Sequence, residues 1–199
     1  KVDESKNLWV AQLDNSLRIF KFNDGKKQKS SEISIHVTDD RILTKSRFHL
    51  NSQNNNLTFA AIIPNNGIYV FANSKWHSFN QSNGITDLDF ISVHTFGSAV
   101  YFSNTSGFYK IENGKISPDL TYHYFSRKHL VLAMNTVRNN SQNTLWILTE
   151  NQIGYIERNK FVPVVDNLNH KYNQREKYFS LIPNYFNSIV WGSAIEINT

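Results

Sequence analysis

The chain has 199 residues, of which 40% are hydrophobic, 14% aromatic and 19% charged. This supply of apolar side chains is sufficient for a folded core and excludes a disordered chain. No stretch reaches the roughly 18 consecutive apolar residues of a membrane-spanning helix, and residues 1–5 lack the apolar run of a secretory signal peptide.

Cysteine is absent from the sequence, which excludes disulfides, thiolate metal sites and cysteine nucleophiles and leaves the redox compartment open. The formal net charge is +5 at pH 7, but the tight basic cluster consists of only three side chains, Lys26, Lys27 and Lys29. We interpret this cluster as a solvated turn. We therefore expect no nucleic-acid partner for this segment.

Short apolar runs recur along the chain in one nine-residue frame, in which polar residues separate the run from a second apolar position. In chain order, a loose copy begins at Leu8, clear copies cover residues 60–68, 100–108 and 145–153, and a shortened copy begins at Ile189. The copies start roughly 40 to 52 residues apart, and self-similarity at this period is typical of β-propeller blades.

A second marker follows each clear copy at a fixed distance of seven residues. It is a lysine with an apolar residue after it, and the three lysines are Lys75, Lys115 and Lys160. The two residues before each lysine are typical of a tight turn between two strands, with Asn113 and Gly114 as the clearest case. Residues 23–26 predict a similar turn in the first unit.

A further β-branched or aromatic run precedes each of the later copies, at residues 90–96, 130–133 and 178–182. Each unit therefore predicts about four short strands joined by tight turns. We expect an all-β fold over residues 1–199, a β-propeller with about four and a half four-stranded antiparallel blades. A blade buries its apolar faces only against its neighbours, which explains why the apolar positions repeat best.

The frame at residues 145–149 and the run at residues 83–109 resemble the two-component regulator propeller repeat. That repeat has Gly-Leu, a short spacer, a strand, Leu-Trp-Ile-Gly-Thr and a second Gly-Leu. The resemblance covers nearly the whole chain in three good copies and two partial ones. The sequence departs from the pattern where Ala60 and Ala61 replace Leu-Trp and where Gln152 replaces the second Gly. The central Gly-Thr is represented only by Gly192-Ser193.

The resemblance implies the sensor β-propeller of a membrane-anchored bacterial regulator, located in the periplasm. It implies a small-molecule or glycan ligand, and a kinase or regulator portion of the same protein as the partner that receives the signal. The unit count leads us to expect a fragment of a larger propeller. The alternative is that the first and last partial units complete one blade together.

Residues that interrupt the repeat are the candidates for a binding site. The strongest candidates lie in the aromatic and basic stretch 120–129, where we assign ligand binding to Tyr122, His123, Tyr124 and Arg127. Aromatic faces and an arginine fork are suited to a sugar or an anion. The alternative is an aromatic strand that fills a gap between blades. We expect the four tryptophans to serve core packing, and we interpret residues 169–177 as a solvated connection.

Catalytic motifs are not found in the sequence. The seven histidines lack metal-ligand spacing, and the acidic pairs at 39–40 and at Asp87 and Asp89 lack the flanking residues of a calcium loop. No nucleophile elbow, phosphate loop or dinucleotide fingerprint is present. We therefore expect no catalytic residue, metal or cofactor. A protein-interaction scaffold and a propeller lyase or hydrolase remain the alternative functions.

Overall fold

The computed structural model describes residues 6–14, 16–23, 26–35, 46–53, 56–118, 130–139, 142–149, 152–158, 160–165, 178–183 and 189–194. The regular elements in these ranges are β-strands, apart from one short 3-10 helix, η1 (Gln81–Asn83). No helix in these ranges is long and apolar enough to cross a membrane. The predicted fold class, all-β with four-stranded antiparallel sheets, is therefore confirmed at this level.

The strands form consecutive antiparallel sheets, which we number along the chain. Sheet 1 holds β1 (Leu8–Leu13), β2 (Ser16–Asn23) and β3 (Lys26–Ser34). Sheet 2 holds β4 (Arg47–Gln53), β5 (Asn56–Ile63), β6 (Gly67–Ala72) and β7 (Lys75–Phe79). Sheet 3 holds β8 (Phe90–Phe96), β9 (Ala99–Asn104), β10 (Gly107–Glu112) and β11 (Lys115–Pro118). Sheet 4 holds β12 (Val131–Asn139), β13 (Gln142–Thr149), β14 (Ile153–Glu157) and β15 (Lys160–Val165), and β16 (Tyr178–Pro183) pairs with β17 (Ile189–Ala194).

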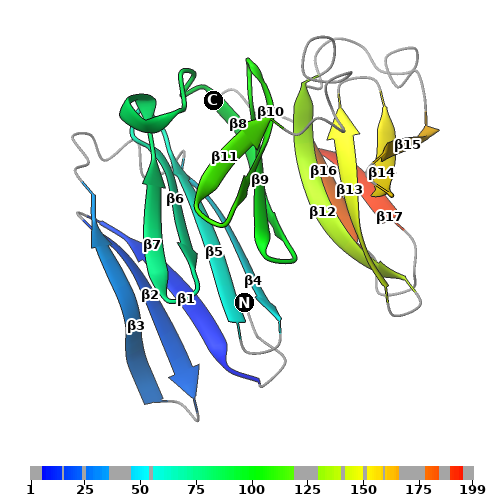
Figure 1. Ribbon diagram of the computed structural model, residues 1–199. Helices are drawn as coiled ribbons and strands as arrows, with labels where there is room; N and C mark the ends of the chain where they lie inside the picture. Colours follow the sequence, from blue (N-terminus) through cyan, green and yellow to red (C-terminus); the bar gives the residue numbers. More distant parts are fainter. Residues whose placement is uncertain are drawn as a thin grey trace, which may run out of the picture.

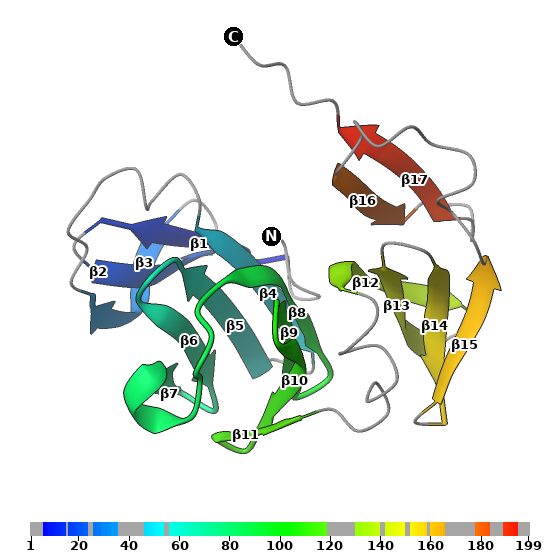
Figure 2. The same ribbon diagram turned by 90° about the horizontal axis from the view of Figure 1, so that it is seen from above.

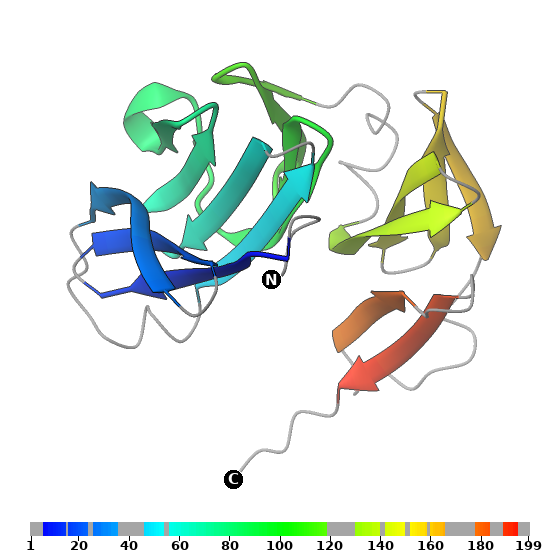
Figure 3. The same cartoon turned by 90° about the horizontal axis from the view of Figure 1, so that it is seen from below.

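The sheets follow one another along an arc with their faces toward each other (Figure 1). The first strands of successive sheets are neighbours, because β4 contacts β8, β8 contacts β12 and β12 contacts β16. These first strands lie along the inner side of the arc, and β7, β11 and β15 lie along its outer side (Figures 2 and 3). The arrangement is propeller-like, and the described sheets do not close into a ring.

The predicted turn chemistry is confirmed at the outer hairpins. Strands β7, β11 and β15 begin at the repeated lysines Lys75, Lys115 and Lys160. Asn113 and Gly114 both have positive φ, at 52° and 72°, as the two-residue turns favoured in β-hairpins require. The β6–β7 turn has the same left-handed backbone, although one of its two residues is a serine.

The core lies between the sheets, because successive residues of a strand point to opposite faces and each face is apolar. Sheets 1 and 2 share the buried side chains of Leu17, Ile19, Ile35, Leu57, Phe59, Ala61, Ile63, Tyr69 and Phe71. Sheets 2 and 3, with the loop before β8, share those of Ala60, Ile62, Ile68, Val70, Phe79, Ile85, Val100, Phe102 and Ile111. Sheets 3 and 4 share those of Phe108, Val131, Met134, Leu145 and Ile147.

The predicted role of tryptophan in packing is confirmed for Trp9 and Trp76, which are half-buried against the core of sheets 1 and 2. It is also confirmed for Trp146, which is half-buried against Leu148 and Ile153 of sheet 4. The interpretation of the lysine cluster as a turn is wrong. β3 begins at Lys26, which pairs with Asn23 of β2, and Lys26 and Lys27 are exposed residues of this strand. The Lys27 ammonium lies 3.8 Å from the centre of the Phe20 ring.

Candidate ligand-binding groove

A groove of about 530 Å³ lies where sheets 2 and 3 separate at one end of their interface. Its walls come from β5, β6 and β7 on one side, and from the β8–β9 turn, β9 and the β10–β11 turn on the other. Pockets for small molecules commonly have volumes of about 300 to 1,000 Å³. The groove is therefore of suitable size for one small ligand.

The groove exists because the residues at this end of the interface are small. Further along, Phe79 and Phe102 fill the space between the two sheets. At the open end the corresponding positions are Ala72, Gly97 and Gly114, which bring no long side chain into the gap. Gly97 and Gly114 lie in the β8–β9 and β10–β11 turns, so two turns of sheet 3 border this space.

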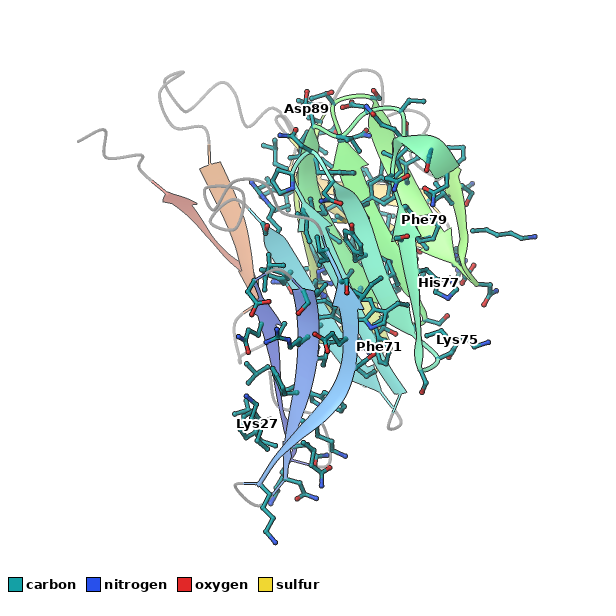
Figure 4. All side chains as sticks on the ribbon, turned by 90° about the vertical axis from the view of Figure 1, so that its left-hand side faces the viewer. Lys27, Phe71, Lys75, His77, Phe79 and Asp89 are labelled. Atoms are coloured by element: carbon teal, nitrogen blue, oxygen red, sulfur yellow. The ribbon has the colours of Figure 1, made fainter. Side chains whose placement is uncertain are left out.

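Two basic residues, Lys75 and His77, stand at the groove on the same face of β7. Phe79, two residues further on, points to that face as well and is buried in the core between sheets 2 and 3. Figure 4 shows the three side chains in sequence along the edge of sheet 2. Strand alternation turns Trp76 to the opposite face, where its indole donates a hydrogen bond to Ser31 Oγ at 2.7 Å.

The position of His77 is fixed by the turn opposite it. A Cβ added to Gly114 would lie 3.1 Å from His77 Cε1, so the imidazole lies directly against this turn. The His77 ring also stacks on Phe79, with the ring centres 6.5 Å apart and an angle of 20° between the planes. The imidazole is thus held at the wall of the groove, while the Lys75 side chain is exposed to solvent.

A separate polar cluster joins the inner strands of sheets 2, 3 and 4. The Thr95 backbone N–H donates to His49 Nδ1 at 3.0 Å, and Thr95 Oγ1 lies 2.7 Å from the same nitrogen. His94 Nε2 is 2.7 Å from Thr136 Oγ1 on β12. Thr95 and His94 are 0% and 1% exposed, so these two residues of the cluster belong to the interior.

The acidic pair at Asp87 and Asp89 acts as a tie between loops. The Asp87 carboxylate accepts hydrogen bonds from the Thr105 and Ser106 hydroxyls and from the Asp89 backbone N–H. Partial burial raises the pKa of Asp87, hydrogen bonds from Ser106, Thr105 and Asp89 lower it, and the net pKa lies below the ordinary value. Within the described part of the chain, no group of three potential metal ligands comes together.

The residues to which the sequence assigned ligand binding, Tyr122, His123, Tyr124 and Arg127, lie outside the described residues, as does the stretch 169–177. Their role stays a prediction. The groove itself was not predicted from the sequence. One signal was present: the residue two positions after the repeated lysine is His77 in sheet 2, but Ser117 and Val162 in sheets 3 and 4.

The fold is that of a propeller-like β protein, and a solved structure with a similar arrangement is known. It is the crystal structure of the extracellular domain of the putative one component system BT4673 from B. thetaiotaomicron, with a TM-score of 0.54 and 16% sequence identity. The match covers 97% of this chain and 25% of that chain, so this chain spans a quarter of the length of the matched structure. At this identity the likeness shows the fold. No family model matches the sequence, and no curated protein matches it.

Proposed function

We propose that this chain belongs to the ligand-sensing region of a bacterial signalling regulator and that its sheets are blades of a β-propeller. The observation that carries the proposal is the structural likeness, over 97% of the chain, to an extracellular domain of a one-component system. The resemblance of residues 145–149 to the two-component regulator propeller repeat supports the same function independently.

In this proposal the sensing region lies in the periplasm, and its partner is the kinase or regulator portion of the same protein. Away from the groove, the interfaces between the described sheets are formed mainly by buried apolar side chains. Such interfaces resist gradual deformation, so the signal is passed by docking or reorientation of the whole propeller.

The ligand is a small molecule or a glycan, and the groove between sheets 2 and 3 is the place where the described residues receive it. An apolar floor with a few polar groups around it is the usual composition of a small-molecule site. Here the floor is formed by Val70, Val100 and Ile111, which are 3%, 1% and 3% exposed, and the polar groups stand above them. A second candidate site for the ligand is formed by the residues that the sequence predicts to bind it, Tyr122, His123, Tyr124 and Arg127.

A protein-interaction scaffold is a second candidate function, because one face of sheet 1 presents apolar side chains to solvent. Trp9 and Ala11 pack toward sheet 2, so strand alternation places Leu8 and Val10 on the other face. Leu8 and Val10 are 42% and 38% exposed. A contiguous exposed apolar patch is typical of an interaction surface, and in this alternative Leu8 and Val10 are two neighbouring members of one.

The proposal is tested by a thermal-shift screen of the purified chain against sugars, amino acids and small organic acids, with hits measured by calorimetry. A ligand that binds only the native state raises the unfolding midpoint by mass action. We include Ala72→Leu, which places a larger side chain in the groove, Ala72→Ser as its size-matched control, and Arg127→Ala for the predicted stretch.

A saturable ligand supports the sensing function. Loss of binding in Ala72→Leu, with binding retained in Ala72→Ser, assigns the ligand to the groove, and loss in Arg127→Ala assigns it to the predicted stretch. No ligand in the screen, together with a protein partner whose binding is lost in Leu8→Lys, contradicts ligand sensing by this chain and favours the scaffold.

A further inference from the structure

The charge of the groove is unbalanced. Its described lining contains Lys75 and His77 and no aspartate or glutamate. The Lys75 ammonium makes no ion pair with any residue in the described ranges, whereas the Lys110 ammonium of sheet 3 lies 2.9 Å from the Glu112 carboxylate. An ammonium without a carboxylate partner, at the mouth of a concave site, attracts anions from solution.

The acidic residues nearest in sequence to the groove lining do not compensate this charge. Ile111 lines the groove, so strand alternation turns Glu112 to the opposite face of sheet 3, where it meets Lys110. Asp89 lies at the opposite end of the sheets from Lys75, as Figure 4 shows. The positive end of the groove is therefore open to an acid supplied by a ligand.

Uncharged polar groups stand around the same space. Thr58 is 7% exposed, and its strand lines the groove together with the Asn73 and Asn113 turns. Amide and hydroxyl groups of this kind bind the hydroxyls of a small molecule. Below them lies the apolar floor that Val70 and Val100 contribute. A ligand that matches all three features has an acid group, hydroxyls and an apolar face.

We propose that the groove binds a small organic acid, with the carboxylate of the ligand held between the Lys75 ammonium and the His77 imidazole. The inference rests on the proposed function, because it names the ligand class for the same groove. The Lys75 side chain approaches the acid from the solvent side, while the His77 ring, fixed against Gly114 and Phe79, donates from the wall.

The test uses calorimetry on the purified chain with three probes. Glucuronate and glucose share a sugar ring and differ in the carboxylate, and hexanoate carries the same acid on an apolar chain. We expect glucuronate to bind at least about ten-fold more tightly than glucose, and its affinity to fall as sodium chloride is raised. Comparison of the affinities for hexanoate and glucuronate shows whether the ligand is a plain aliphatic acid or a sugar acid.

Two sets of variants test where the carboxylate of the ligand binds. Lys75→Gln weakens glucuronate binding by about five- to ten-fold. Lys160→Gln removes the same charge from the equivalent lysine of sheet 4 and leaves binding within about two-fold of the wild type. His77→Leu weakens binding, and His77→Gln, which keeps a hydrogen-bond donor, restores part of it.

The β10–β11 turn provides a steric test. Gly114→Ala presses a methyl group on the His77 ring, whereas Gly97→Ala, also at positive φ, meets nothing within 4 Å. We expect weaker glucuronate binding in Gly114→Ala alone. Equal affinity for glucuronate and glucose, no change in Lys75→Gln, or no binding of either acid up to about 10 mM overturns the inference. If a neutral ligand binds the wild type and its binding is lost in Ala72→Leu, the proposal of an organic acid as the ligand is overturned, but the proposed sensing function is not.

Discussion

His49 and His94, from the first strands of sheets 2 and 3, hold their imidazole rings with centres 3.9 Å apart and planes inclined by 40°. Each histidine also reaches the next sheet along the arc, His49 through Thr95 and His94 through Thr136. The inner strands of three sheets are therefore joined by one run of polar side chains. A junction of this kind fixes the relative position of the sheets.

The first prediction concerns the hydrogen bond at His49. Because the Thr95 N–H donates to His49 Nδ1, this nitrogen carries no proton, and a substitution that removes the acceptor leaves a buried donor unpartnered. We expect His49→Leu to lower the free energy of unfolding by about 1 to 3 kcal/mol, measured by urea denaturation. His49→Asn places an amide oxygen near the position of Nδ1 and should lose clearly less. Equal losses in the two variants would contradict a role for the acceptor.

The second prediction is a pH dependence at Asp87. Its pKa is lower in the folded chain than in the unfolded chain, so its stabilising contribution is present above the unfolded value of about 3.9 and is lost as pH falls through the folded value. We expect Asp87→Asn to lower the free energy of unfolding by about 0.5 to 1 kcal/mol at pH 7. The difference from the wild type should shrink below about pH 4.

Asp89→Asn is the matched control for Asp87, because Asp89 takes part in this network through its backbone N–H. It removes one negative charge two residues away and keeps the hydrogen bonds to Thr105 and Ser106. The control should behave like the wild type across the pH series. A similar loss in both variants would mean that net charge, and not the tie between the loops, determines the effect.

The third prediction concerns Ala61, which stands where the repeat has tryptophan. Tyr101 and Trp146 occupy the equivalent position in sheets 3 and 4 and are half-buried, but Ala61 is 0% exposed. Because Tyr69 and Phe71 already fill this interface, Ala61→Trp overpacks it and should lower the free energy of unfolding by about 3 kcal/mol or more. Tyr101→Trp is the control and should change it by less than about 1.5 kcal/mol. A stable Ala61→Trp variant would show that the interface between sheets 1 and 2 can adapt.

The strands were predictable from the sequence because their determinants are local. The run at residues 90–96 is strand β8 over its full length, and the turn at Asn113 and Gly114 lies where its left-handed preference places it. The lysine cluster was misplaced for a reason that is also local. The pairing of β2 with β3 begins at Asn23 and Lys26, so the first lysines of the cluster already belong to the ladder.

The groove could not be predicted in the same way, since it depends on how two sheets meet. Ala72 and Gly97 come from different units, and neither is unusual within its own repeat. Only the packed sheets bring these small residues opposite one another and leave the space between them. The polar signal at His77 was visible in the sequence, but its meaning required the turn at Gly114 against which the ring lies.

The last prediction explains a glycine of the repeat. Gly67, which precedes the second apolar position of its frame, has a φ of 131°, and a Cβ added there would lie 2.2 Å from the Phe79 carbonyl oxygen. Gly67→Ala therefore combines an unfavourable backbone with a clash against backbone that cannot move aside, and we expect a loss of more than about 3 kcal/mol in the free energy of unfolding. Gly97→Ala, at a φ of 60° in open space, isolates the backbone cost and should lose about 1 kcal/mol. Thermal and urea unfolding measure the free energy of unfolding of the two variants. If Gly67→Ala and Gly97→Ala lose the same amount, β6 and β7 approach each other less closely than the structure indicates, and Gly67 is needed only for the backbone conformation of the turn.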